Sequence, residues 1–229
     1  MEKHISLDER SELYRPGLSD TPAHWFKKAV EFSNTFYSEE ISRASKVSFE
    51  DLSPELFFSE YIWVVHATGF SAKAVSQFIP RLIPAYGSFD ICGTSELDVL
   101  LSRVLPVCNN RQKAKAVWQM SKIIIKGIGD RGWEAFKKSE LYPVDSLSKL
   151  PYIGNITKYH LGRNIGILDC VKPDLHFVRM AAHWGYSDAH SMITDMNRNF
   201  SYPLGIADMI AWYYASSFGT LYMKKVGQR

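Results

Sequence analysis

The stretch from Leu150 to Arg179, LPYIGNITKYHLGRNIGILDCVKPDLHFVR, decides the fold of this chain. Its pattern predicts a helix that ends near Leu150, a tight turn over 151–154, a second helix, a short loop and a third helix that opens at Asp174. The first N–H groups of a helix have no partner within it, and together with the helix dipole they can hold a phosphate oxygen. The stretch therefore predicts a hairpin of helices that grips a nucleic-acid backbone without reading its bases.

Glycine and short polar side chains shape this predicted hairpin. Gly154 lies where the chain must reverse, and glycine takes a positive φ without a Cβ clash. Asn155 or Thr157 is expected to cap the second helix, because the side-chain oxygen of either can accept a free backbone N–H. We therefore expect the reversal at Gly154 and the second helix directly after it.

The order of residues resembles a known family at this point. The segment L-P-Y-I-G, followed by Asp174-Leu-His176-Phe-Val-Arg179, is similar to the helix-hairpin-helix DNA glycosylases of the endonuclease III superfamily. Asp174 follows Gly154 by 20 residues, which is the usual spacing in that family. In the alternative interpretation the segment is a pair of capped helices, and Asp174 is an ordinary N-cap after Pro173.

The resemblance implies a fold class and a domain division. It implies an all-α, two-lobed helix-hairpin-helix glycosylase fold with a cleft between the lobes, and the chain shows no pattern of long strands. One lobe would be a helical barrel over residues 50–165 that contains the hairpin. The second would combine the N-terminal segment 20–49 with the C-terminal segment 166–229, so that Asp174 lies at the seam.

Roles for individual residues also follow from the resemblance. Asp174 matches the catalytic aspartate, whose carboxylate would stabilise an oxocarbenium-like sugar and orient a water molecule. Family members that also cut the backbone carry a lysine two residues after the second hairpin glycine, where this chain has Ile156. We therefore expect a monofunctional glycosylase that leaves an abasic site. A glycosylase with lyase activity through Lys158 stays open as an alternative.

The hairpin is expected to contact the DNA backbone and a cation. By position, the residues that would contact DNA are Pro151, Tyr152, Ile153, Gly154, Asn155 and Thr157. The family usually has glycine where this chain has Tyr152, so the tyrosine either blocks one phosphate contact or presents an aromatic surface to DNA. The backbone carbonyls of Leu150, Ile153 and Ile156 match those that bind a monovalent cation such as K⁺ or Na⁺ in the family.

A wedge and a base pocket are implied elsewhere in the chain. Extruding a base costs a few kcal/mol, and a side chain that fills the gap offsets part of this. His66 matches the wedge position, although a histidine at a helix C-terminus is the alternative interpretation. Aromatic residues and histidines at five positions can line the pocket or simply pack the core: Trp25, Trp63, His66, Tyr152 and His160.

Glycines and basic residues guide the prediction for the middle of the chain. Residues 84–94 are predicted to form a loop, and a helix is predicted from Arg111 to about Ile125, followed by a connection at Gly127, Gly129 and Gly132. Lys113 and Lys115 near its start can contact phosphate, or they can simply form a solvated helix face.

Composition narrows the class of protein further. The chain has 229 residues, a net charge of +3 and three cysteines, Cys92, Cys108 and Cys170. Three cysteines cannot ligate the four-cysteine iron–sulfur cluster of many endonuclease III relatives, and the odd number argues against a disulfide framework. Apart from the hairpin cation, we expect no cofactor.

The partner and location are expected from the same features. The N-terminus is charged, and no apolar run approaches the ~20 residues that span a membrane, so we expect a cytoplasmic, nucleoid-associated monomer. The partner would be double-stranded DNA with a damaged or modified base, in repair or in defence against phages. A non-catalytic helix-hairpin-helix DNA-binding protein and an unrelated α-helical protein are the rival interpretations.

Overall fold

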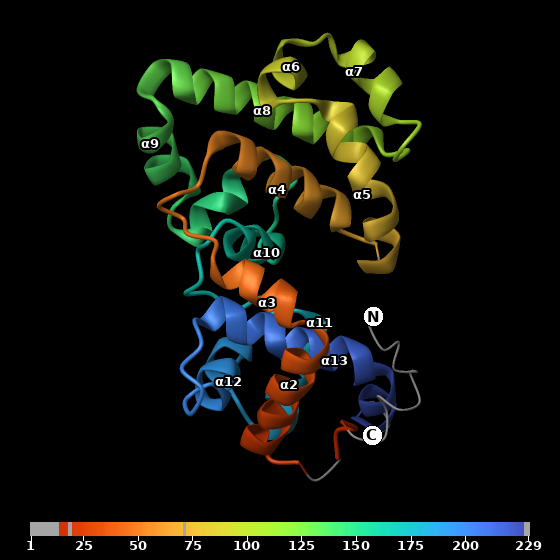
Figure 1. Ribbon diagram of the computed structural model, residues 1–229, viewed down its shortest axis with the longest axis vertical. Helices are drawn as coiled ribbons and strands as arrows, with labels where there is room; N and C mark the ends of the chain where they lie inside the picture. Colours follow the sequence, from red (N-terminus) through yellow and green to blue (C-terminus); the bar gives the residue numbers. More distant parts are fainter. Residues whose placement is uncertain (1–13, 18–19, 71, 227–229) are drawn as a thin grey trace. The chain divides into compact units, whose positions relative to one another are not determined.

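The computed structural model describes residues 14–17, 20–70 and 72–226 (Figure 1). Over these residues the chain forms helices and no strand, so the prediction of an all-α fold of two lobes is confirmed. One unit, unit 1, spans Met1–Lys46 and Leu168–Arg229, and the other, unit 2, spans Val47–Ile167. Within the described residues, no helix is both long enough and apolar enough to cross a membrane.

Each unit has its own helices. Unit 1 contains α2 (Pro22–Phe36), α3 (Ser38–Ser45), α11 (Leu175–Trp184), α12 (Ala189–Met196) and α13 (Leu204–Val226). Unit 2 contains α4 (Pro54–Ala67), α5 (Ala72–Tyr86), α6 (Phe89–Thr94), α7 (Leu97–Val104), α8 (Arg111–Arg131), α9 (Trp133–Phe136), a π-helical turn (Lys137–Leu141), a 3₁₀ helix (Val144–Lys149) and α10 (Thr157–Asn164).

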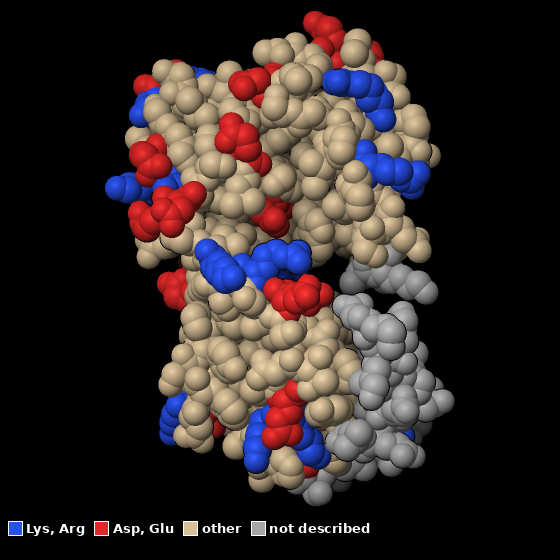
Figure 2. Space-filling view, in the orientation of Figure 1, with Lys and Arg blue, Asp and Glu red and all other residues tan. Residues whose placement is uncertain are grey.

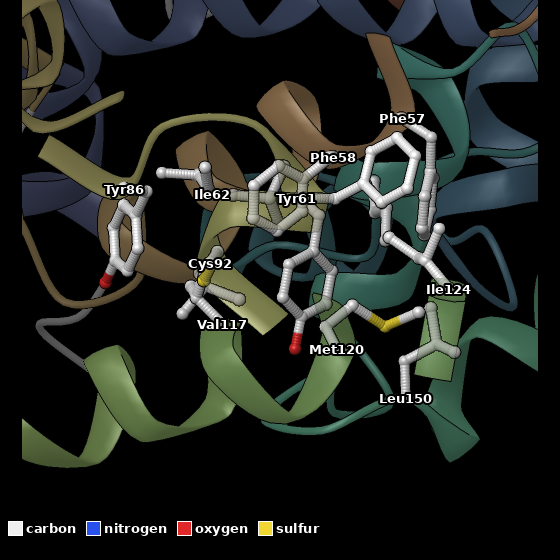
Figure 3. Packing of buried hydrophobic residues seen from close by; sticks show 14 of the residues in the cluster. Phe57, Phe58, Tyr61, Ile62, Tyr86, Cys92, Val117, Met120, Ile124 and Leu150 are labelled. Atoms are coloured by element: carbon white, nitrogen blue, oxygen red, sulfur yellow. The ribbon is translucent and has the colours of Figure 1, made fainter. Parts of the chain in front are cut away.

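Helix α4 is the centre of unit 2 because it is apolar on nearly all sides. Phe57, Phe58 and Tyr61 on this helix are almost completely buried. Figure 3 shows them facing side chains of α8 such as Met120. The Tyr61 hydroxyl donates a hydrogen bond to the carbonyl of Pro151, so the core of unit 2 also holds the hairpin turn in place.

Two glycines of unit 2 serve helix packing where the sequence predicted turns. Helix α8 continues through Gly127 to Arg131, and a Cβ on Gly127 would lie 2.2 Å from Cδ2 of Phe136. The predicted loop over 84–94 is wrong, because α5 continues to Tyr86 and α6 begins at Phe89. Gly93 lies inside α6, where a Cβ would lie 2.5 Å from Cδ1 of Ile125 on α8. Both glycines therefore allow close helix–helix approach.

Helix α10 ends in a Schellman motif. Gly166 has φ +89°, its N–H donates to Arg163 O at 3.2 Å, and the Ile167 N–H donates to Gly162 O at 2.8 Å. A Cβ on Gly166 would lie 2.4 Å from the backbone N of Phe49. This segment therefore requires glycine both for its backbone conformation and for space.

Unit 1 is held by α2 and α13, which pack along each other. Aromatic side chains from both helices form its centre, including Trp25, Phe32 and Tyr214. Helix α11 adds Phe177 and Met180 to this core. Asp174 and His176, at the N-terminal end of α11, are half-buried.

Candidate functional site

The hairpin turn in unit 2 is a type II turn with an unusual third residue. Ile153 N donates to Leu150 O at 3.1 Å across Pro151 and Tyr152, and Tyr152 has φ +63°. Gly154 does not have a positive φ, so the prediction that it makes the reversal is wrong. The third residue of a type II turn has a positive φ. Glycine adopts this conformation without strain, whereas a residue with a Cβ, such as tyrosine, adopts it at a cost in conformational free energy.

The start of α10 has no side-chain cap. Ile156 is the N-cap, and neither Asn155 nor Thr157 accepts a capping hydrogen bond, so the capping prediction is wrong. The first turn is closed instead by the Lys158 N–H, which donates to Gly154 O at 3.0 Å. Among the described residues, nothing accepts a hydrogen bond from the backbone N–H of 154, 155, 156 or 157. These four groups are therefore available to an anion.

Replacing Tyr152 by glycine is expected to raise the free energy of unfolding by about 0.5–1 kcal/mol. Relief of the left-handed conformation gains about 1–2 kcal/mol, and the flexibility of glycine costs about 0.5–1 kcal/mol. Urea denaturation measures the difference. Tyr142→Gly is the matched control, since Tyr142 is similarly exposed but has φ −129°, and it should lose stability. Equal losses in both variants would contradict the strain at position 152.

Lys113 is almost completely buried, close to Tyr152 of the hairpin. It is 2% exposed, and its ammonium donates to His66 O at 3.1 Å and to Thr68 O at 2.5 Å. The same ammonium lies 4.7 Å from the ring centroid of Phe70 and 5.9 Å from that of Tyr152. The prediction that Lys113 contacts phosphate is therefore wrong, because its charge caps the C-terminal carbonyls of α4.

His66 is also buried, so it cannot fill a gap in DNA. Its side chain is 0% exposed, and its Nε2 lies 2.8 Å from the Tyr86 hydroxyl. Burial, and secondarily the Lys113 charge, lowers the pKa of His66 to about 3, so the imidazole is neutral. Both the wedge and the pocket interpretation of His66 are wrong, and the residue belongs to the core of unit 2.

Phe70 is an exposed aromatic residue that was not among the wedge and pocket residues predicted from the sequence. It follows Gly69 directly after α4 and is 47% exposed, beside the similarly exposed ring of Tyr152 across the Lys113 ammonium. Gly69 has φ +82°, which turns the chain outward at this point. Its exposure could have been predicted from the sequence, because a large aromatic residue directly follows a glycine that ends a helix.

The remaining aromatic pocket candidates fall into two groups. Trp25 is 2% exposed and packs edge-on against Tyr214 and Trp184 in the core of unit 1, so its assignment to a pocket is wrong. Trp63 and His160 are half-buried in unit 2, and their rings meet at right angles with centroids 5.0 Å apart. These two residues stay candidates for binding.

The two lysines near the start of α8, Lys113 and Lys115, differ in exposure. Lys115 is exposed, as the sequence predicted for a solvated or phosphate-contacting residue. In the face drawn in Figure 2, lysine and arginine side chains are interspersed with aspartate and glutamate. A contact between Lys115 and phosphate stays a prediction.

Asp174 in unit 1 is the N-cap of α11. Its Oδ1 accepts hydrogen bonds from His176 N at 2.9 Å and Phe177 N at 3.1 Å. Within the described part of the chain, no hydrogen bond reaches the second oxygen, Oδ2, and the side chain is half-buried. The carboxylate is thus fixed through one oxygen, and the other is free for a water molecule or a cationic group.

Lys158 is held in an ion pair. Its ammonium lies 2.5 Å from Oδ1 of Asp145 and 5.0 Å from the Tyr159 ring centroid. The hydrogen bond that Lys158 donates to the Asp145 carboxylate is the main cause that raises the pKa of Lys158, although burial opposes it. A lysine nucleophile must lose its proton, so this environment disfavours attack by Lys158 on a sugar.

The hairpin carbonyls are compatible with a monovalent cation. Leu150 O and Ile156 O each accept one backbone N–H, from Ile153 and Tyr159, which leaves a lone pair on each oxygen. Over the described residues, no group of three or more histidine, cysteine, aspartate or glutamate side chains is arranged to hold a metal ion. The cation at Leu150, Ile153 and Ile156 stays a prediction.

Comparison with solved structures defines the class of fold. No protein-family model matches the chain, and no curated protein matches it either. The chain has the fold of the helix-hairpin-helix DNA glycosylases, as the resemblance of the hairpin segment predicted.

Two solved structures carry this conclusion. The 8-oxoguanine DNA glycosylase Tm1821 of Thermotoga maritima matches with a TM-score of 0.61 and 16% identity, over 86% of this chain and 98% of that one. The 8-oxoguanine glycosylase/lyase of Methanocaldococcus jannaschii, in complex with DNA containing 8-oxoguanine, matches with a TM-score of 0.60 and 19% identity, over 83% and 96%.

Proposed function

We propose that this chain is a monofunctional DNA glycosylase, which extrudes a damaged or modified base from double-stranded DNA and hydrolyses its N-glycosidic bond. The observation that carries the proposal is Asp174, a fixed carboxylate with one free oxygen, at the family's spacing from the hairpin. The fold shared with two 8-oxoguanine glycosylases supports the same class of enzyme.

The chemistry requires one carboxylate and one water molecule. The bond between C1′ and the base nitrogen breaks with both electrons leaving on the base, and the sugar becomes oxocarbenium-like. The Asp174 carboxylate stabilises that positive charge and accepts a proton from the attacking water. The water oxygen then bonds to C1′, the departing base takes up a proton from solvent on its nitrogen, and Asp174 returns the proton it accepted to solvent, so that an abasic site and the free base remain.

Binding of the DNA backbone is assigned to the hairpin. The four N–H groups of 154–157 point to a phosphate site at the start of α10. A monovalent cation on the Leu150, Ile153 and Ile156 carbonyls would add a positive charge next to the phosphate. Phosphate contacts carry no base information, so the hairpin would position the enzyme without selecting the substrate.

The absence of lyase activity rests on positions 156 and 158. Ile156 has no nucleophile, and the ammonium of Lys158 is paired with Asp145. Borohydride reduction during the reaction is therefore expected to trap no protein–DNA adduct. Ile156→Lys is the informative variant, since it restores an amine at the family's position. An adduct formed by the wild type and lost in Lys158→Ala would instead establish the bifunctional alternative.

Phe70 takes the place of His66 as the proposed wedge. Phe70→Ala is expected to lower the single-turnover rate on duplex DNA about tenfold, because stacking on an aromatic side chain offsets about 1–3 kcal/mol of the extrusion cost. The rate on single-stranded DNA should not change. Ile91→Ala, which removes a similarly exposed apolar side chain on α6, is the control. Equal losses on single and double strands would contradict the wedge.

A panel of duplexes tests the proposed function. Each duplex carries one altered base, beginning with 8-oxoguanine and continuing with alkylated, deaminated and modified cytosine bases, and hot alkali then cuts at abasic sites. Cleavage only after alkali supports a monofunctional glycosylase and names its base. If no duplex is cleaved although the chain binds DNA in a salt-dependent manner, the non-catalytic DNA-binding protein is the better account.

A further inference from the structure

Two exposed aromatic side chains of unit 2 share one buried positive charge. Phe70, directly after α4, and Tyr152, in the hairpin turn, are 47% and 42% exposed. The Lys113 ammonium lies over both rings, 4.7 Å from the centroid of the first and 5.9 Å from that of the second. Because each ring turns one face toward this ammonium, its other face is available for stacking. Phe70 and Tyr152 are called the ring pair below.

The ring pair is held in place before any ligand binds. An ammonium within about 6 Å of a ring centroid attracts that ring. The Lys113 ammonium is itself fixed, because it also donates hydrogen bonds to the carbonyls of His66 and Thr68 at the end of α4. The ring of Phe70 packs edge-on against that of Phe78 on α5, with centroids 5.5 Å apart. The two rings therefore lose little freedom when they bind a flat ligand.

The backbone of Tyr152 indicates that its side chain serves more than the turn. Its φ is +63°, a conformation that glycine would adopt without strain. In the part of the chain that the structure describes, no hydrogen bond reaches the Tyr152 hydroxyl. Strained residues persist where their surroundings fix them, and they concentrate at binding sites. The aromatic ring, rather than the hydroxyl, is thus what the tyrosine contributes.

A nucleobase is the ligand that matches the ring pair. Tyr152 stands two residues before Gly154, whose N–H begins the proposed phosphate site, and two residues span at most about 7 Å. A strand held at that site therefore passes within reach of the rings. Every base has a π-face, so stacking on an aromatic side chain tolerates any sequence.

The state of the DNA decides whether the ring pair can stack. In an intact duplex, neighbouring bases already cover both faces of each base. Where one base is missing, the bases that border the gap each expose a face. The ring pair therefore gains contacts on DNA with a gap that it cannot gain on an intact duplex.

We propose that Phe70 and Tyr152, positioned by Lys113, stack on the bases that border a gap in duplex DNA, so that the chain binds DNA lacking one base more tightly than intact DNA. The inference rests on the proposed contact of the hairpin with DNA, and it adds a second stacking residue to the proposed wedge. It concerns residues of unit 2 alone and does not depend on Asp174.

Equilibrium binding to two matched duplexes tests the proposal. One duplex is intact, and the other carries a tetrahydrofuran analogue of an abasic site, which has no base to excise. We expect the wild type to bind the second duplex at least about tenfold more tightly. Tyr152→Ala should lower this ratio of affinities about tenfold, within the effect of removing one stacked ring. Tyr152→Phe keeps the ring and the left-handed backbone, and it should keep the ratio.

Lys113→Met tests the positioning role, because it keeps an unbranched side chain of similar length and removes the charge. It should lower the ratio about threefold although Lys113 does not touch DNA, since the rings lose the attraction that holds them. Tyr142→Ala is the matched control, because it removes a tyrosine that is 50% exposed in unit 2 outside the hairpin, and it should leave the ratio unchanged. An unchanged ratio in Lys113→Met would overturn the positioning role.

The ratio of affinities separates stacking from folding. If Tyr152 only covered the Lys113 charge, Tyr152→Ala would change both affinities alike and leave the ratio unchanged, which would overturn the inference. Equal binding of both duplexes by the wild type would also overturn it, while the glycosylase reaction would still be judged by excision from the panel of altered bases. No salt-dependent binding to either duplex would overturn both the inference and the proposed function.

Discussion

Replacing Asp174 by asparagine is expected to lower the single-turnover excision rate by about 10³-fold, within the range for loss of a charge-stabilising or general-base group. The side chain of asparagine caps helices as well as that of aspartate, so its Oδ1 can accept the same two hydrogen bonds from His176 and Phe177. The variant therefore keeps the start of α11 and removes only the negative charge. Affinity for DNA should change less than about threefold, since a loss of one charge near the sugar leaves the hairpin contacts intact.

Asp188→Asn is a closely matched control for this experiment. Asp188 is the N-cap of α12 in the same unit, and its Oδ1 accepts from Ser191 N at 2.7 Å. If Asp174 contributed only a helix cap, both variants would keep their activity and lose similar, small amounts of stability. Full activity in Asp174→Asn, with DNA binding retained, would favour the non-catalytic interpretation and remove the main support for the proposed reaction.

The hairpin shows how far the sequence predicts local structure. The order of Pro151, Gly154 and Asp174 was sufficient to predict helices, a turn and a capped third helix, because each of these features depends on residues close in sequence. The residue that makes the turn was not predictable in the same way. Tyr152 has the positive φ, and it stays there because the Tyr61 hydroxyl and the Leu150 carbonyl fix its neighbours.

Glycines in unit 2 show why element boundaries were harder to predict. In sequence, Gly93 and Gly127 have the same appearance as turn residues, since glycine is common at chain reversals. In the structure they lie inside helices, where the partner that excludes a Cβ comes from another helix. Only the packing of α6 on α8, and of α8 on Phe136, distinguishes a packing glycine from a turn glycine.

Some of the predicted site residues were wrong because their side chains are buried. The sequence analysis named Lys113 and His66 as candidates for contact with DNA, but both side chains are buried in unit 2. The same fold brings Phe70 to the surface a few residues later. A shift of a few residues along a helix end reverses exposure, and single-sequence patterns do not fix helix ends with that accuracy.

Gly166→Ala is expected to lower the free energy of unfolding of the chain by about 2–5 kcal/mol. A left-handed conformation costs a residue with a Cβ about 1–2 kcal/mol, and overpacking adds about 1–3 kcal/mol. The added Cβ would lie 2.4 Å from Phe49 N and 2.7 Å from Ser48 C, and these are backbone atoms that no rotamer change can move. Since domains are stable by about 5–15 kcal/mol, the variant should show a large fall in its urea midpoint.

Gly129→Ala, the same change at a glycine within a helix of unit 2, is expected to have the opposite effect on the free energy of unfolding. Gly129 lies within α8, has no positive φ, and a Cβ there would meet nothing within 4 Å. Alanine should therefore stabilise the helix by up to about 1 kcal/mol. Opposite signs in the two variants would show that space and backbone conformation at Gly166, rather than the glycine-to-alanine change itself, hold the end of α10. A loss below about 1 kcal/mol in Gly166→Ala would mean that residues 48–49 can move away from α10, which their backbone contact with Gly166 argues against.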